Sequence, residues 1–416
     1  MSAVAAQDIP GRDRPWIAYV APFAFPEGGA AARRVLGNAQ SLVRAGYDVV
    51  VVSAQIDRDG DAARPFAPGL WIASTSERDA EHLPRALKRL RYAAMGRRTR
   101  NWIAGADIPP AAVILYSGYT PYLMQLMPMC RRRNLPLLFD AVEWYTAPTL
   151  PGFLRSPYLW NTEFAMRALI SRLDGVIAIS SYLARWYSAR RRPVAQIPPT
   201  LDLAQVPART ERAPGGRIVL AYSGSASNDL LDVVIAALMQ VDPQGAAFEL
   251  RIAGPQAADI AALPALKGQG DLPPVIRALG RVPHAQSLDA VRGADFTVFL
   301  RRINRVSTAG FPTKFCESLS LGTPVITNLT SDLASVLKDG ENGFVCPAPD
   351  ADALAVLLRR VMTLSPDQIE TMRVQSRTSA EAHFDMRLYA DAMAGLITAA
   401  RAHRGLPPVG TTPRTS

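Results

Sequence analysis

The chain of 416 residues is too long for one ordinary hydrophobic core, so we expect two domains of about 200 residues each. Apolar residues make up 49% of it and charged residues 20%, which excludes a disordered or fibrous chain. The three cysteines are odd in number and widely spaced, without a CxxC pair, which argues against a disulfide framework or a metal site and favours a reducing, cytoplasmic location.

The net charge of +10 is concentrated in the first half of the chain. Residues 1–200 hold 25 Lys/Arg against 15 Asp/Glu, whereas residues 201–416 hold 21 of each. Such asymmetry indicates that the two halves have different partners. The uncharged stretch 108–130 is interrupted by glycine and proline, so we expect a strand at 112–116, a turn and a helix rather than a membrane span.

The first elements in the chain form a βαβ pattern. Residues 16–22 predict a buried strand, a turn with Gly28 and Gly29 opens a helix that runs to Ala45, and residues 47–54 predict a second buried strand. The turn lacks a GxGxxG fingerprint, so it does not indicate a dinucleotide site. Its glycines would instead let a substrate approach the backbone closely.

Residues 85–100 carry seven basic side chains and no acidic one. This segment could be the solvated face of a helix, or it could contact anionic lipid headgroups or a lipid diphosphate. Nucleic acid is not favoured as a partner, because no aromatic-basic binding module accompanies the charges.

A further strand is predicted at 135–140, followed by one at 174–180. Asp140 and Glu143 would lie just past the carboxyl edge of the first of these, where open α/β sheets bind their ligands. Either residue could be a catalytic or acceptor-contacting carboxylate, and either could equally cap the following helix. The aperiodic, proline-rich stretch 198–217 is the best domain boundary.

The second half repeats the alternation of strands and helices. Strands are predicted at 218–222, 248–254, 275–282 and 294–301, and helices at 351–362, 366–383 and 384–403. We place one domain at 15–200, joined by the returning helix at about 385–404, and the other at 213–384. Residues 1–14 and 405–416 are expected to be disordered tails.

Residues 309–327 (A-G-F-P-T-K-F-C-E-S-L-S-L-G-T-P-V-I-T) contain the strongest functional signal. A helix is predicted from Pro312 to Leu321, and its free N–H groups near Phe311 to Lys314 would suit an anion such as a diphosphate. Glu317, one turn further, could accept hydrogen bonds from both hydroxyls of a ribose. The alternative is an ordinary amphipathic helix with Glu317 on its solvent face.

These motifs, in this order, resemble the GT-B-fold glycosyltransferases of the large retaining group called family 4. The resemblance is carried by P-F-A-F-P-E-G-G-A-A-A-R-R, F-D-A-V-E-W-Y, D-G-V-I-A-I-S-S-Y-L, A-Y-S-G-S, L-R-I-A-G-P and the block at 309–350. It implies two Rossmann-like α/β domains facing each other across a cleft, with a final helix that crosses back to the first. The first domain would bind the acceptor and the second a nucleotide-sugar donor, without a metal or other cofactor.

The resemblance also assigns residues on the donor side. Glu317 matches the second glutamate of the family's Glu, seven residues, Glu pattern, which usually binds the donor ribose, but Ala309 stands in place of the first. Main-chain groups of Gly310 to Pro312 could still face the sugar. The remaining expected donor contacts are Thr313, Gly224, Ser225 and Arg301.

Two further departures from the family affect the expected chemistry. The loop 223–228 lacks the usual Arg and Lys, so we expect Lys314 to stabilise the leaving diphosphate, with Arg301 or Arg302 as a second cation. The frequent histidine of the first domain is replaced by the segment 116–119, and we expect Tyr119 on the acceptor side. The four histidines lie elsewhere, at His82, His284, His383 and His403.

We therefore predict transfer of a sugar from a nucleotide diphosphate sugar to a hydroxyl, with Lys314, Asp140 and Glu143 as candidate catalytic residues. The basic half suggests a lipid-linked or otherwise anionic acceptor at the inner face of the cytoplasmic membrane, as in bacterial surface polysaccharide assembly. A nucleotide-sugar epimerase of the same fold and a catalytically silent nucleotide-sugar-binding protein remain alternatives.

Overall fold

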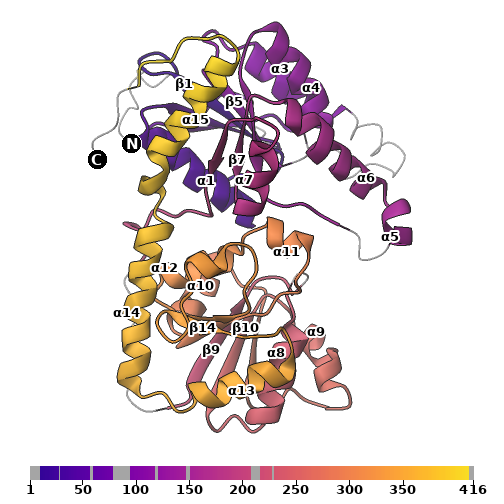
Figure 1. The fold of residues 1–416 in the computed structure, drawn as a ribbon, viewed down its shortest axis with the longest axis vertical. Coiled ribbons are helices and arrows are strands. Elements are labelled where there is room, and N and C mark those ends of the chain that lie inside the picture. The colour runs from indigo at the N-terminus through magenta and orange to yellow at the C-terminus, as the bar shows by residue number, and fades with distance from the viewer. Residues whose placement is uncertain are drawn as a thin grey trace. The chain divides into compact units, whose positions relative to one another are not determined.

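The structure is a computed structural model and describes residues 10–27, 29–56, 60–77, 94–117, 120–146, 150–207, 216–226 and 229–411. The described residues divide into two compact units, each with its own sheet (Figure 1). Unit 1 contains the residues up to Asp202 and those from Met386 onward, and unit 2 contains Leu203–Asp385. The division after Asp202 falls within the proline-rich stretch 198–217.

Unit 1 is an α/β structure around a single sheet. Its strands are β1 (Trp16–Ala21), β2 (Asp48–Ser53), β3 (Arg64–Ala67), β4 (Leu70–Ser74), β5 (Ala112–Tyr116), β6 (Leu137–Ala141), β7 (Gly175–Ala178) and β8 (Val194–Gln196). Its α-helices are α1 (Gly29–Arg44), α3 (Arg97–Ala104), α4 (Thr120–Arg132), α5 (Leu150–Leu154), α6 (Pro157–Phe164), α7 (Ser181–Ser188) and α15 (Ala390–His403). A π-helical turn, Ala165–Leu169, continues α6.

The order of strands in unit 1 defines where a ligand is expected. Within the described residues the sheet reads β3-β4-β2-β1-β5-β6-β7-β8, and the edge strand β3 alone runs antiparallel to its neighbour. The strand order reverses between β1 and β5, which is the switch point where open α/β sheets form a crevice at the carboxyl ends of their strands. The loops after β1 and β5 are therefore the expected ligand-facing segments of unit 1.

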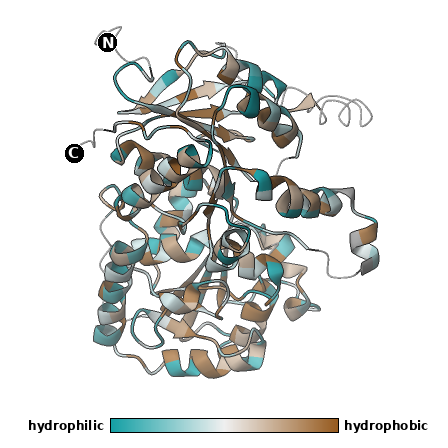
Figure 2. Ribbon diagram, turned by 45° about the horizontal axis from the view of Figure 1, so that its top comes forward, coloured by the Kyte–Doolittle hydropathy of each residue, from teal (hydrophilic) through white to brown (hydrophobic). Residues whose placement is uncertain are grey.

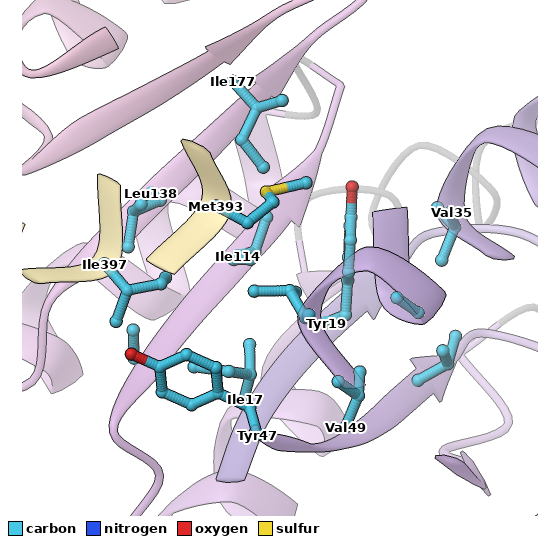
Figure 3. Close-up of a cluster of buried hydrophobic side chains, with 14 of the residues drawn as sticks. Ile17, Tyr19, Val35, Tyr47, Val49, Ile114, Leu138, Ile177, Met393 and Ile397 are labelled. Atoms are coloured by element: carbon cyan, nitrogen blue, oxygen red, sulfur yellow. The ribbon is translucent and has the colours of Figure 1, made fainter. Parts of the chain in front are cut away.

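The core of unit 1 is formed by the central strands and two helices, α1 and α15. The strands read as continuous apolar runs because both faces of a parallel sheet are covered. Figure 3 shows Met393 and Ile397 of α15 against Ile114 and Leu138 of the sheet. The last helix thus belongs to the core of the unit that contains the first strand.

Residues 405–411, which we assigned to a disordered tail, are placed by contacts in unit 1. Arg401 Nε donates to the carbonyl of Pro407 at 2.8 Å, and Val409 packs against the core that α15 helps to form. At the other end, Gly11 N lies 3.5 Å from Asp48 Oδ2. These segments differ from the expectation because each has hydrogen-bonding or apolar partners outside itself, in α15 or in the core of unit 1.

Unit 2 has a second parallel sheet. Its strands are β9 (Ile218–Ser223), β10 (Phe248–Ala253), β11 (Ile276–Gly280), β12 (Phe296–Val298), β13 (Val325–Thr327) and β14 (Gly343–Val345). Its α-helices are α8 (Leu231–Val241), α9 (Ala257–Ala261), α10 (His284–Arg292), α11 (Arg305–Ala309), α12 (Thr313–Ser320), α13 (Ala351–Val361) and α14 (Pro366–His383). The described strands follow the order β11-β10-β9-β12-β13-β14, so the switch point lies between β9 and β12.

The uncharged stretch 108–130 contains β5 and most of α4, so the predicted strand and helix are both present. None of the helices in the described ranges is long and apolar enough to cross a membrane. Among the described residues, no group of three or more His, Cys, Asp and Glu side chains is arranged to hold a metal ion.

Candidate functional site

The helix predicted to bind an anion is α12, and its start lies beside the switch point of unit 2. It begins at Thr313, with Pro312 as the extended residue before it, and ends at Ser320, one residue inside the prediction at each end. Gly310, which follows the last residue of α11, is also extended, so a straight segment connects α11 to α12. No side chain caps the first turn, in which Phe315 N donates to the carbonyl of Pro312 at 3.0 Å, so a ligand could be bound by the N–H groups of Thr313 and Lys314.

Lys314 is the cation of this helix start, and it is held by a carboxylate that the sequence analysis did not select. Its Nζ donates to Asp229 Oδ2, and Arg301 Nε lies 3.7 Å from the other oxygen, Oδ1. Asp229 and Arg301 also pair as an isolated β-bridge between the loop after β9 and the end of β12. The structure thus brings together two predicted cations, Lys314 and Arg301, around one buried anion.

Aromatic rings and a glycine complete the surroundings of Lys314. The Nζ atom lies 4.4 Å from the ring centroid of Tyr222, whose hydroxyl is 2.8 Å from Asp229 Oδ2. Burial, and then the charge of Asp229, raises the pKa of Tyr222, so the phenol remains a neutral donor. Burial lowers the pKa of Lys314 although Asp229 acts in the opposite direction.

Gly224, a predicted donor contact, leaves room for this cation. A Cβ atom at residue 224 would lie 3.3 Å from Lys314 Nζ, and the backbone there has φ of +121°. Gly254, from the next strand, approaches so closely that its Cβ would lie 2.3 Å from the carbonyl oxygen of Gly224. Gly224 and Ser225 are both exposed, so this loop offers backbone groups to a ligand.

Glu317 lies on the inner side of α12 rather than on a solvent face. Its side chain is 10% exposed, and its Oε1 lies 3.8 Å from Nε2 of His284, the first residue of α10. From the sequence, His284 was given no role in the donor site. Its position after β11, at the carboxyl edge of the sheet, is the signal that would have indicated it.

The other residues predicted around the start of α12 are more buried than expected. Ala309, Gly310, Phe311 and Pro312 are buried, and Thr313 is half-buried. The Phe311 ring packs at 5.9 Å from that of Phe384 and 6.2 Å from that of Phe315. The side chain of Phe311 therefore has a packing role, and only its main chain can contact a ligand.

Asp140 corrects the prediction for unit 1, because it lies within β6 and its side chain has no exposed surface. Its Oδ1 accepts from Arg34 Nε and Nη2 at 3.0 and 2.8 Å, and its Oδ2 accepts from Tyr19 OH at 2.6 Å. Asn38 Nδ2 lies 3.3 Å from the same oxygen. A carboxylate with all these partners and no access to solvent is a structural anion and cannot contact a substrate.

The charge of Asp140 shifts the pKa values of its neighbours Arg34 and Tyr19. Burial alone would lower the pKa of Arg34, but Asp140 raises it. Burial, followed by the charge of Asp140, raises the pKa of Tyr19. Arg34 is therefore a permanent cation and Tyr19 a permanent donor within the core of unit 1.

Of the other residues predicted for the site in unit 1, the structure describes Glu143 and Gly29. Glu143 lies past the end of β6 and is half-buried, and its interaction with Tyr145 helps to raise the pKa of that phenol, which burial chiefly causes. Gly29 is the first residue of α1, with φ of +69°. Gly28 and Tyr119 lie outside the described residues.

The basic segment 85–100 is described only from residue 94. Two of its arginines, on α3, donate hydrogen bonds within unit 1: Arg98 to the carbonyl of Ser76 at 2.6 Å and Arg100 to Gln125 Oε1 at 2.8 Å. Arg97 is exposed. The described part of the segment is thus divided between structural and solvent-facing charges.

Comparisons with known proteins agree with this architecture. Residues 217–363 match the family of group 1 glycosyl transferases, and residues 29–200 match the glycosyl transferase 4-like domain. The chain belongs to the group 1 glycosyltransferases. It is therefore a transferase, and the two matched segments correspond to units 2 and 1.

Similar proteins extend the same conclusion over most of the chain. A phosphatidyl-myo-inositol mannosyltransferase from Mycolicibacterium smegmatis is 26% identical over 381 residues, which cover 88% of this chain and 89% of that protein. A putative colanic acid biosynthesis glycosyltransferase, WcaL from Salmonella typhimurium, is 26% identical over 200 residues, covering 47% of this chain and 49% of that one.

Solved structures show that the fold is GT-B. Sucrose-phosphate synthase from Thermosynechococcus elongatus has a TM-score of 0.73 at 17% identity, over 94% of this chain and 100% of that one. HepE from Anabaena, in complex with UDP-glucose, has a TM-score of 0.62 at 14% identity, over 92% of this chain and 100% of that one.

Proposed function

We propose that this glycosyltransferase takes its sugar from a nucleotide diphosphate sugar bound in unit 2, at the start of α12. The observation that carries the proposal is the meeting of Lys314 and Arg301 at the switch point between β9 and β12, beside a helix start that no side chain caps. Cations and helix N-termini both favour a diphosphate. The structure of the similar protein HepE in complex with UDP-glucose supports a donor of this class.

Each side chain of this site has a proposed role. Lys314 and Arg301 bind the diphosphate, and in its absence Asp229 balances their charge. Glu317, one turn into α12, accepts hydrogen bonds from the ribose hydroxyls. His284 lies beside Glu317 and limits the space in which the nucleoside can lie.

The proposed chemistry is retaining and needs no protein nucleophile. The oxygen of the acceptor hydroxyl forms a bond to the anomeric carbon on the face from which the diphosphate leaves. The bond from that carbon to the diphosphate oxygen breaks, and the leaving diphosphate takes the acceptor proton. Ala309 cannot contact the sugar through a carboxylate, so the extended main chain of Gly310 to Pro312 is proposed to face it.

For the acceptor, we propose a lipid-linked or otherwise anionic molecule at the inner face of the cytoplasmic membrane. The excess of basic residues in residues 1–200 supports an anionic partner. The names of two similar proteins, a phosphatidyl-myo-inositol mannosyltransferase and a colanic acid glycosyltransferase, support synthesis of a glycolipid or a surface polysaccharide. The segment 85–100 stays a hypothesis for the membrane contact.

Removing the carboxylate of Glu317 tests the donor site directly. Because one hydrogen bond to a charged group contributes about 1.5–3 kcal/mol, Glu317→Ala should bind the nucleoside diphosphate at least about 10- to 100-fold more weakly in isothermal titration calorimetry. The matched control is Glu341→Ala, which removes an exposed carboxylate of the same unit and should change nothing. Full donor affinity in the Glu317 variant would refute the ribose contact.

A further inference from the structure

The donor site of unit 2 contains a carboxylate, Asp229, whose charge opposes the diphosphate proposed to bind there. Its side chain is 6% exposed and lies between those of Lys314 and Arg301, which are 16% and 8% exposed. Lys314 Nζ donates to Asp229 Oδ2, and Arg301 Nε lies 3.7 Å from Oδ1. An anion between the cations of a phosphate site weakens the binding of phosphate, so Asp229 has a consequence for the ligand.

The main chain fixes Asp229 in this position. Leu230 N donates to the carbonyl of Leu300 at 2.8 Å, and Asp229 pairs with Arg301 in an antiparallel β-bridge. Arg301 N in turn donates to Asn328 Oδ1 at 2.8 Å, and the carbonyl of Arg301 accepts from Asn328 Nδ2 at 2.9 Å. The backbone of Asp229 is therefore held at the carboxyl end of β12, beside any ligand that binds there.

The surroundings make the charges of this cluster act strongly on one another. The strands that lead to it, β9 and β12, are apolar, and Figure 2 shows the strands of the sheets largely in brown, the hydrophobic end of its scale. The ring centroids of Tyr222 and Phe299 lie 4.4 and 5.3 Å from Lys314 Nζ. Charges among apolar groups are screened less than charges in water, so Asp229 repels a phosphate bound to Lys314 strongly.

Lys314 can exchange Asp229 for a phosphate, because its flexible side chain carries three N–H donors. The hydroxyl of Tyr222 donates to Asp229 Oδ2 at 2.8 Å and keeps the carboxylate in place when Lys314 turns to the ligand. When the ligand leaves, Lys314 pairs with Asp229 again. The empty site is then spared a buried cation without a partner, which favours release of the ligand.

The donor and the spent nucleotide differ in charge at this point. Each phosphate of a nucleotide diphosphate sugar is esterified and carries one negative charge. In the transfer, the bond from the anomeric carbon to the diphosphate breaks, and its electron pair stays on the diphosphate oxygen, which takes the acceptor proton. The terminal phosphate then loses this proton to water near neutral pH, because the second pKa of a phosphate monoester is about 6. The product therefore carries one negative charge more than the donor.

We infer that Asp229 discriminates by charge against the spent nucleoside diphosphate and so promotes its release after transfer. Its carboxylate repels donor and product alike in direction, but it repels the product more, because the additional charge lies on the terminal phosphate. Asp229 is thus a specificity-determining residue of the donor site. The inference rests on the proposed function, since it requires the diphosphate to lie at Lys314.

Isothermal titration calorimetry with the full chain tests the inference, with UDP, GDP, UDP-glucose and GDP-mannose as ligands. Asp229→Asn removes the charge and keeps an oxygen that accepts from Tyr222. We expect it to bind the nucleoside diphosphate about tenfold more tightly, with a smaller gain for the matching sugar nucleotide. A merely structural carboxylate would have the opposite effect, because its loss would misplace Lys314 and weaken both ligands. The control Asp289→Asn removes an exposed carboxylate paired with Arg292 and should change neither affinity.

The outcomes separate this inference from the proposed function. If Lys314→Met loses affinity for the nucleoside diphosphate while Asp229→Asn gains none, the donor site stands and the inference is overturned. Equal gains for nucleoside diphosphate and sugar nucleotide would overturn it too. If neither substitution changes any affinity, the proposed donor site itself is wrong. Asp229→Ser, which is smaller and also neutral, must reproduce the gain of Asp229→Asn. Failure of both variants to fold, seen by circular dichroism, would assign Asp229 a structural role instead.

Discussion

Replacing Lys314 with methionine is expected to lower kcat for donor turnover by about 10²- to 10³-fold. The substitution removes a buried cation at the point where charge develops on the leaving diphosphate, and a group that acts there contributes mainly to the transition state. Methionine is similar in length to lysine, so its side chain can still lie against the ring of Tyr222 and beside Gly224. Turnover is measured as release of the nucleoside diphosphate.

Two further variants define what Lys314 contributes. Lys338→Met removes an exposed lysine of the same unit and should leave kcat unchanged. Because burial lowers the pKa of Lys314 despite Asp229, kcat/KM should decline at a lower alkaline pH than an ordinary lysine would cause. Lys314→Arg keeps its charge and should abolish that decline. Full turnover in the methionine variant would show that the diphosphate lies elsewhere.

Replacing Asp140 with alanine is expected to destabilise the protein by about 3–5 kcal/mol, because Arg34 would remain buried without its carboxylate. The pair is inaccessible to solvent, and Arg34 Nη1 also donates to the carbonyl of Ile197 at 3.0 Å. The network therefore joins α1, β6 and the segment after β8. Urea unfolding followed by circular dichroism measures the change.

The comparison with Glu143 distinguishes a structural role from a catalytic one. Glu143→Ala removes a half-buried carboxylate beyond the end of β6 and should cost less than about 1 kcal/mol of stability. If Asp140→Ala kept the stability of the wild type but lost turnover, Asp140 would be a catalytic residue and the structural role would be wrong.

The elements with strong local signals were predictable from the sequence. The parallel strands are continuous apolar runs, and Pro312 and Gly322 mark the limits of α12 to within one or two residues. The alternation of strands and helices predicts parallel strands, whose carboxyl ends lie at one edge of the sheet together with the loop after β9 and the end of β12. Lys314 and Arg301 therefore could be expected near each other.

What the sequence could not show are partnerships between distant residues. Asp229 lies 85 residues before Lys314, and Arg34 lies 106 residues before Asp140. No periodicity signals either pair, so Asp140 was read as a ligand-facing carboxylate when it is the partner of a buried arginine. Four short strands were also missed, β3, β4, β8 and β14, because runs of three to five residues carry too weak a pattern.

The helices α5 and α6 show the same limit at the surface. Many of their residues are apolar, so the sequence alone would place them in a core, and only the fold reveals that Leu154, Trp160 and Phe164 are exposed. The surface is recognisable because Glu163 is bonded to Trp144 and Arg167, which fixes the direction in which α6 projects.

Product analysis with a panel of UDP- and GDP-sugars is the most direct test of the account. Each sugar is incubated with the enzyme, and the products are identified by nuclear magnetic resonance and mass spectrometry. The account predicts, for at least one donor, release of the nucleoside diphosphate with transfer or hydrolysis of the sugar, and loss of that release in Lys314→Met. Isomerised donor, or donor that binds without any release of nucleoside diphosphate, would contradict it.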